Sequence, residues 1–124
     1  MSTAVYPDWV PNVLPLPEGS LADILEATAA AAPDAPAIHY FDATITYAQL
    51  DDYANRFATL LAAWGIERGD RVALYLQNVP QTLIALYGIW KRGAAAVPLN
   101  PMFKQKELEY HLNDSGSRVL VCLE

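Results

Sequence analysis

The side chains that could carry chemistry in this chain of 124 residues fall into a few short groupings. Glu107, His111 and Asp114 are spaced four and three residues apart, so a helix would hold them on one face, where carboxylate and imidazole groups could bind a metal ion. The other histidine in the sequence, His39, lies far upstream. We therefore expect these side chains to form surface ion pairs, and we expect no metal site.

Paired carboxylates could perform acid–base catalysis if they converged on one substrate atom. Asp51 and Asp52 are adjacent in the sequence, and Glu107 and Glu109 are two residues apart. Residues at these spacings do not face each other on a helix. Both pairs are therefore interpreted as solvated charges.

Nucleophilic and phosphate-binding features are equally sparse. Cys122 has no histidine near it in the sequence that could act as its base, and the apolar run around it predicts a packed side chain. Ser115-Gly116-Ser117 could serve as a phosphate loop, but such a loop opens into a helix, and here a strand-like segment follows. We interpret it as a turn. The sequence thus predicts no catalytic residue, no cofactor-binding residue and no metal ligand.

The elements that position these side chains alternate between strand and helix. Strand-like runs begin at Arg71, Ala95 and Val119, 24 residues apart, and a helix-length segment fills each gap. This order favours an α/β fold, a parallel sheet with right-handed helical crossovers. The runs at Arg71–Leu76 and Arg118–Leu123 have the apolar character of strands that are covered on both faces.

Helix boundaries are marked by caps and glycines. Thr46, followed three residues later by Gln49, makes a capping box that predicts a helix from Tyr47. This helix should end at Gly65, and a second, largely buried helix should end at Gly93, because glycine enters the left-handed conformation at low cost. The apolar face of the first of these helices is expected to comprise Leu50, Tyr53, Phe57, Leu60, Leu61 and Trp64.

The remaining segments complete the organisation of the chain. Residues 1–19 contain four prolines and should form an extended arm that lies on the body, while residues 20–124 should form the α/β unit. Ser20 is expected to cap a helix that stops before Pro33, and residues 37–46 to form a hairpin. A last helix should start near Gln105.

Two asparagines are the best polar candidates for a ligand contact. Ligands of open parallel sheets bind beyond the carboxyl ends of the strands, and Asn78 and Asn100 follow the first two strands of the predicted sheet. They are our candidate substrate-binding residues. The alternative is structural, since Asn78 could cap the next helix and Asn100 could shape a turn ahead of Pro101.

Two stretches together resemble a known family. Ile45-Thr-Tyr-Ala-Gln-Leu50 and Trp90-Lys-Arg-Gly-Ala-Ala-Ala-Val-Pro-Leu-Asn-Pro101, in this order and about forty residues apart, resemble the first two core motifs of the acyl-adenylate-forming enzymes. That family includes acyl-CoA ligases, luciferases and peptide-synthetase adenylation domains. Pro98-Leu-Asn-Pro101 followed by Glu107-Leu-Glu-Tyr-His-Leu-Asn-Asp-Ser115 is most similar to fatty-acid and other acyl-CoA ligases, and Tyr6-Pro-Asp-Trp-Val-Pro11 resembles the lead-in of the long-chain enzymes.

The resemblance implies a fragment of a larger enzyme. Residues 20–124 would be the N-terminal portion of the large domain of an acyl-CoA synthetase, and the partner of the fragment would be the remainder of the ligase. The complete enzyme would use ATP, Mg²⁺ and CoA to activate a fatty acid. Family members carry their phosphate loop, ribose-binding aspartate and catalytic lysine in later segments, so no catalytic residue is carried over and the chain alone is expected to be inactive. Lys104 departs from the family, which commonly has Thr or Ser there.

Composition and charge narrow the alternatives. Residues 1–55 hold eight acidic and no basic residues, whereas residues 56–124 hold six acidic and eight basic ones, so no basic stripe predicts nucleic-acid binding. The acidic N-terminus fits no targeting signal, no apolar run is long enough for a transmembrane segment, and the lone cysteine suits a cytoplasmic protein.

Two other functions remain open at this stage. One is a different adenylate-forming ligase, for example an aryl-acid CoA ligase. The other is a non-catalytic module that self-associates through the apolar edge at Arg118–Leu123, because a bare apolar strand edge is a template for pairing with another chain. We expect self-association of this chain in either case.

Overall fold

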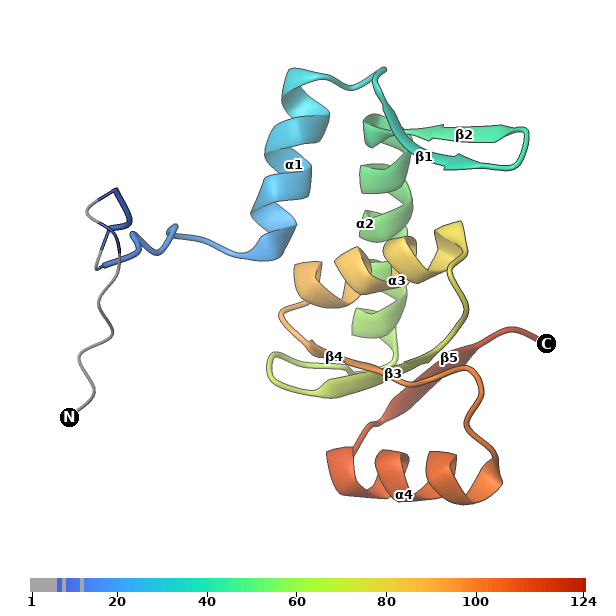
Figure 1. Ribbon diagram of the computed structural model, residues 1–124. Helices are drawn as coiled ribbons and strands as arrows, with labels where there is room; N and C mark the ends of the chain where they lie inside the picture. The colour runs from blue at the N-terminus through green and yellow to red at the C-terminus, as the bar shows by residue number, and fades with distance from the viewer. Residues whose placement is uncertain (1–6, 8, 12) are drawn as a thin grey trace.

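The computed structural model describes residue 7, residues 9–11 and residues 13–124. A three-stranded sheet lies between helices, and a separate hairpin projects from the top of the molecule (Figure 1). Along the chain the elements are α1 (Leu21–Ala31), β1 (Pro36–Tyr40), β2 (Ala43–Thr46), α2 (Tyr47–Ala63), β3 (Arg71–Tyr75), α3 (Pro80–Lys91), β4 (Ala95–Pro98), α4 (Gln105–Ser115) and β5 (Val119–Cys122).

The sheet has the predicted parallel topology. Its strand order is β4-β3-β5, and the three strands begin at Arg71, Ala95 and Val119, as the spacing in the sequence predicts. Arg71 pairs with Ala95 on one side of β3, and Val72 pairs with Val119 on the other. In Figure 1, α3 covers one face of this sheet and α4 lies against the other. The expectation of an α/β fold with helical crossovers is confirmed.

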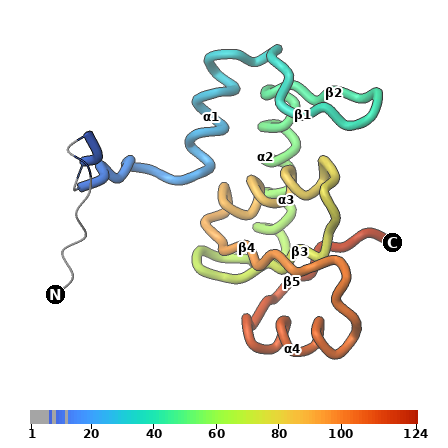
Figure 2. The backbone as a smooth tube through the Cα atoms, viewed as in Figure 1, coloured from blue at the N-terminus to red at the C-terminus, as the bar shows by residue number. Residues whose placement is uncertain are grey.

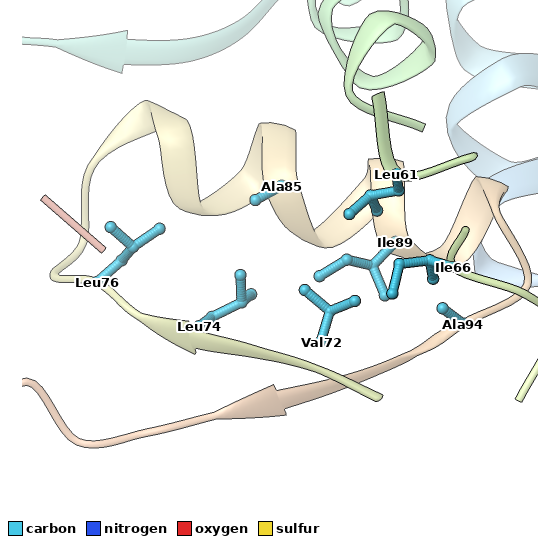
Figure 3. Close-up of a cluster of buried hydrophobic side chains, with 8 residues drawn as sticks. All are labelled: Leu61, Ile66, Val72, Leu74, Leu76, Ala85, Ile89 and Ala94. Carbon is cyan, nitrogen blue, oxygen red and sulfur yellow. The ribbon is translucent and has the colours of Figure 1, made fainter. Parts of the chain in front are cut away.

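The main core lies between the sheet and α3. Val72 and Leu74 of β3 meet Ile89 of α3 and Leu61 of α2 (Figure 3), and all four side chains are buried. Burial of each such side chain contributes roughly 1.5–3 kcal/mol. The whole cluster comprises Leu61, Ile66, Val72, Leu74, Leu76, Ala85, Ile89 and Ala94.

A second cluster lies on the opposite side of α3. Leu25 of α1 packs against Leu50 and Ala54 of α2, and half-buried residues of α3 and the hairpin close around them. The backbone trace in Figure 2 shows α1 beside α2, with α3 crossing the lower half of α2. Helix α3 is therefore shared by both clusters, and α2 also reaches the core on the sheet through Leu61.

The crossing of α2 and α3 depends on a glycine. A Cβ atom added at Gly88 would lie 2.7 Å from Phe57 Cδ1 and 3.0 Å from the carbonyl oxygen of Ala54. A larger residue would therefore require Phe57 or the backbone of the two helices to shift. The two helices thus approach each other closely at Gly88.

The predicted helix boundaries are confirmed. The backbone N–H of Thr46 donates to Gln49 Oε1 at 2.9 Å, and the N–H of Gln49 donates to Thr46 Oγ1 at 3.2 Å. Gly65 and Gly93 both have φ of 75°, in the left-handed region past the ends of α2 and α3. At the start of α4, the N–H of Lys104 donates to Glu107 Oε2 at 2.8 Å.

Several burial expectations were wrong. The described arm residues do not lie on the body, since Trp9 is 83% and Leu16 88% exposed, and no hydrogen bond holds the described part of this segment to the helices. On α2, Leu50 and Leu61 are buried, but Tyr53, Leu60 and Trp64 are exposed, because the elements packed on α2 cover only part of its surface.

β5 also differs from its prediction. Val119 and Val121 pack on the main core, whereas Leu120 and Cys122, on the other face, are exposed. The reason is that α4 has no buried residue and covers this face thinly. The prediction of a strand covered on both faces holds for β3 and fails for β5.

Lys91, near the end of α3, joins three helices. Its ammonium lies 2.6 Å from Glu26 Oε1 of α1 and 2.8 Å from Asp51 Oδ1 of α2, and its side chain is 5% exposed. Burial lowers the pKa of Lys91, but the hydrogen bonds and charges of Asp51 and Glu26 outweigh burial and hold this pKa above its ordinary value of 10.5. Asp51 is therefore not the solvated charge that the sequence suggested, whereas Asp52 forms an exposed pair with Arg56 at 2.8 Å.

We predict that replacing Lys91 with methionine lowers the free energy of unfolding by about 1–3 kcal/mol at neutral pH, because the Asp51 carboxylate loses its partner. Since folding raises the pKa of Lys91, the stabilisation is complete below pH 10.5 and is lost as the pH rises through the raised pKa. Urea denaturation at a series of pH values should show the gap between the two proteins closing in alkali.

The control for this prediction is Arg56→Met, which removes the exposed pair with Asp52. Its cost should stay within about 0.5 kcal/mol. Equal losses for the two variants would show that the buried position of Lys91 contributes nothing.

Candidate functional site

The carboxyl ends of β3 and β4 border two adjoining hollows. One, of about 310 Å³, lies between the hairpin and the start of α3. The second, of about 490 Å³, lies beyond the end of β3 and reaches Pro101. Tyr40, Asn78 and Val79 line both, so we treat them together as the carboxyl-end hollow. Its lining residues are Ile38, His39, Tyr40, Leu76, Gln77, Asn78, Val79, Pro80, Thr82, Leu83 and Pro101.

The lining of the carboxyl-end hollow carries no Asp, Glu, Lys or Arg. Ile38, Val79 and Leu83 provide apolar surface, and His39 is held by Thr44 across the hairpin, with Nδ1 3.1 Å from Oγ1. Such a surface suits an uncharged, largely apolar group and offers no countercharge to a phosphate.

Asn78 lines this hollow, and its side chain takes no part in holding the fold. It is exposed, and within the described part of the chain its amide makes no hydrogen bond. The prediction that it caps α3 was wrong, because the cap position is Val79, which provides no side-chain bond. Instead, Thr82 Oγ1 donates to the carbonyl of Gln77 at 2.6 Å and fixes the turn into the helix.

Asn100 has the structural role that the sequence offered as an alternative. Its Oδ1 accepts from the backbone N–H of Met102 at 2.9 Å, which closes the turn after β4. It does not line the carboxyl-end hollow, although the turn it shapes presents Pro101 there. The two asparagines are therefore not brought together as a pair of ligand contacts.

Charged side chains gather at the opposite, amino end of the sheet. Arg71 Nε donates to the carbonyl of Ser115 at 2.7 Å, and Arg92 Nε donates to that of Ile66 at 2.6 Å. Arg118 Nη1 reaches both the carbonyl of Gly65, at 3.0 Å, and Asp70 Oδ2, at 2.7 Å. These arginines bind carbonyls at the ends of α2 and α4 and in the following turn, so they hold the fold.

Asp70 takes part in the same network. The backbone N–H of Glu67 donates to its Oδ2 at 2.8 Å, and this bond, followed by the Arg118 guanidinium, holds the pKa of Asp70 below its usual value of 3.8. Asp70 is therefore ionised at neutral pH as a structural anchor of the turn before β3.

The other chemical groupings of the sequence have structural explanations. His111 makes no ion pair in the described part of the chain; it stacks on Phe103, with ring centroids 4.8 Å apart, so the expected ion pairs were wrong. Ser115 ends α4, and the predicted turn follows at Gly116, with φ of 62°, before β5. Cys122 is exposed, which contradicts its expected packing.

Two larger features are absent from the described residues. No group of three or more His, Cys, Asp or Glu side chains is placed to hold a metal ion. None of the helices in this part of the chain is long and apolar enough to cross a membrane.

The molecule is a parallel α/β unit, and the hollow at the carboxyl end of its sheet is lined by uncharged residues. Comparison with known proteins gives its family: residues 25–124 match the AMP-binding enzyme model, and the chain belongs to this family. The long-chain-fatty-acid–CoA ligase of Bacillus subtilis (strain 168) is 39% identical over 121 residues, which cover 98% of this chain and 22% of that protein. The chain thus spans about a fifth of the length of this curated relative.

Two solved structures share the fold. The N-terminal domain of FACL13 from Mycobacterium tuberculosis superposes with a TM-score of 0.79 at 38% identity, covering 82% of this chain and 26% of that one. The N-terminal subdomain of NpsA from Klebsiella oxytoca, solved in complex with anthranilyl-AMSN, has a TM-score of 0.77 at 27% identity, covering 82% and 27%. These likenesses confirm the family resemblance that the two sequence stretches indicated.

Sequence reasoning missed the hairpin side of the hollow. Tyr40 and His39 lie on β1, which is not part of the parallel sheet, so the rule about strand ends did not point to them. The signal available in the sequence was the aromatic pair Tyr40-Phe41 at the hairpin turn. In the structure, Phe41 has φ of 52° and is 90% exposed.

We predict that Asn78→Ala leaves the free energy of unfolding within about 0.5 kcal/mol of the parent value, because no bond of the fold is lost. Asn100→Ala should cost about 1 kcal/mol, since the N–H of Met102 loses its acceptor. Urea denaturation of the two variants checks this difference. A larger loss for Asn78→Ala would show that its amide supports the turn after all.

Proposed function

We propose that this chain is the N-terminal part of an ATP-dependent fatty-acid–CoA ligase. The complete enzyme would condense a fatty acid with ATP to an acyl-adenylate, release pyrophosphate, and transfer the acyl group to the thiol of CoA. Support comes from membership of the AMP-binding enzyme family and from the 39% identity to a long-chain-fatty-acid–CoA ligase. The observation that carries the proposal is the uncharged, apolar lining of the carboxyl-end hollow.

The described residues do not fit the phosphate or metal groups of this reaction. The carboxyl-end hollow has no cationic side chain, the turn at Gly116 runs into a strand, and no set of metal ligands converges in the described part of the chain. ATP, Mg²⁺ and the phosphates of CoA are therefore assigned to the remainder of the ligase, and no chemical step is assigned to this chain.

The role that suits these residues is a channel wall for the uncharged part of the substrate. Ile38, Val79 and Leu83 would contact an acyl chain, and burial of each methylene group there would contribute about 0.8 kcal/mol. The free amide of Asn78 would provide the polar contact at the rim. Asn100 would act through the turn that positions Pro101, rather than by touching the substrate.

We predict that the 124-residue chain alone neither binds ATP nor exchanges pyrophosphate into it, because its hollow offers phosphate no countercharge. Titration calorimetry with MgATP should give no saturable heat at micromolar concentrations. Saturable binding would contradict this assignment of the nucleotide, and a Ser115→Ala variant would then show whether the turn at Gly116 is responsible.

A chimera tests the positive part of the proposal. Replacing the matching N-terminal fifth of the Bacillus subtilis ligase with this chain should give an enzyme that forms long-chain acyl-CoA. In this chimera, Leu83→Asp should raise the KM for a long-chain acid about tenfold or more while leaving the KM for ATP near its original value, since only the apolar contact is lost. The matched control is Leu60→Asp, on the exposed side of α2.

The same chimera distinguishes the proposed fatty-acid–CoA ligase from the second candidate function, an aryl-acid CoA ligase. That alternative is favoured by the likeness to NpsA, whose subdomain was solved with an anthranilyl ligand. A folded chimera that is indifferent to Leu83→Asp with fatty acids, but loses activity with aryl acids, would support the aryl ligase. If Leu83→Asp leaves the activity of a folded chimera unchanged with both fatty and aryl acids, the proposed channel wall is wrong.

A further inference from the structure

The two parts of the carboxyl-end hollow meet at Tyr40. The part of about 310 Å³ and the part of about 490 Å³ share three lining residues, Tyr40, Asn78 and Val79. Asn78 and Val79 precede α3, whereas Tyr40 ends β1, in the hairpin above the start of α3 (Figure 1). The passage from one part to the other is therefore bounded by the turn before α3 on one side and by an aromatic residue of the hairpin on the other.

Phe41, the next residue, is held in a backbone conformation that disfavours it. It is the first of the two turn residues between β1 and β2, and its φ of 52° lies in the left-handed region. Two-residue hairpin turns take glycine, asparagine or aspartate at such positions, because a larger side chain crowds the backbone there. Burial does not compensate for this strain, since Phe41 is 90% exposed. A strained, exposed residue beside a hollow indicates a functional role.

The Phe41 ring packs on Tyr40. The two ring centroids lie 4.7 Å apart at an interplanar angle of 79°, the edge-to-face arrangement that aromatic pairs favour. Successive side chains of a strand point to opposite faces, so the left-handed backbone of Phe41 is what lets these consecutive rings meet. In β1, His39 is held by Thr44, but no hydrogen bond among the described residues involves the Tyr40 hydroxyl. The Phe41 ring, rather than a polar partner, therefore fixes the Tyr40 side chain.

We propose that Tyr40 determines which acyl-chain lengths the carboxyl-end hollow accepts, and that Phe41 is the residue that positions the Tyr40 ring. This inference rests on the proposed function, because it assigns the acyl chain to that hollow. A short chain fits within one part of the hollow, whereas a longer chain has to pass between Tyr40 and the turn at Asn78 to reach the other part. The ring therefore sets the length at which further methylene groups stop gaining apolar contact.

Chain-length preference in the Bacillus subtilis chimera tests this role. We expect Tyr40→Ala to raise the ratio of kcat/KM for a C16 acid to that for a C8 acid about tenfold or more, because each methylene group that enters the other part of the hollow adds roughly fourfold. Tyr40→Phe keeps the ring and should retain the parent's ratio. The matched control is Tyr53→Ala, on α2, because Tyr53 is 39% exposed, close to the 36% of Tyr40, and does not line the hollow.

Phe41 is tested by separating its effect on stability from its effect on selectivity. Phe41→Gly removes the ring and the backbone strain together, so the urea midpoint of unfolding of the 124-residue chain should stay the same or rise. In the chimera, the same variant should raise the C16-to-C8 ratio about as much as Tyr40→Ala does, although Tyr40 is intact. Phe41→Trp keeps an aromatic ring and should retain the parent's ratio.

The outcomes distinguish failure of this inference from failure of the proposed function. If Leu83→Asp raises the KM for the long-chain acid but Tyr40→Ala leaves the C16-to-C8 ratio unchanged, the hollow holds the acyl chain and Tyr40 does not limit its length. If neither variant has an effect, the channel wall is wrong and this inference fails with it. A lower midpoint for Phe41→Gly together with the parent's ratio would show that Phe41 only holds the hairpin.

Discussion

The close contact of α2 and α3 at Gly88 is the constraint on which the rest of the structure depends. Because Gly88 has no side chain, Phe57 and the Ala54 carbonyl come directly against the α3 backbone. α3 can then bury Ala85 and Ile89 in the main core on one side and support the Leu25 cluster on the other. A wider spacing would separate these two clusters, and the start of α3, which lines the carboxyl-end hollow, would lose its fixed position relative to the hairpin.

The two ends of the sheet are chemically different, because different side chains form the internal hydrogen bonds at each end. At the amino end, the carbonyls at the ends of α2 and α4 need donors, and Arg71, Arg92 and Arg118 supply them. At the carboxyl end, the side chains that bond within the turns after β3 and β4 are the uncharged Thr82 and Asn100. The arginines at the amino end are thus used for internal bonds, and the carboxyl-end hollow is lined by uncharged residues.

The features that could be predicted from the sequence are those that local chemistry decides. The capping box at Thr46, the left-handed Gly93 and the strand starts depend on neighbours a few residues away, so their patterns are visible in the chain. Burial was harder, because it depends on which layer an element occupies: Trp64 lies on the outer layer, and Cys122 lies under the thinly packed α4. The candidate site was half visible. Strand ends pointed to Asn78, but Tyr40 comes from a hairpin whose place against α3 no local pattern encodes.

The contacts around Lys91 also indicate which helix detaches first in local unfolding. α1 is held by two buried side chains, Ala22 and Leu25, and by the ion pair from Glu26 to Lys91, whereas α3 is held by both clusters. Detaching α1 therefore exposes little apolar surface, whereas detaching α3 disrupts both hydrophobic clusters. Amide hydrogens of α1 should therefore exchange fast and those of α3 slowest. The chain thus consists of a helix that unfolds locally, α1, and a centre around α3 that unfolds cooperatively.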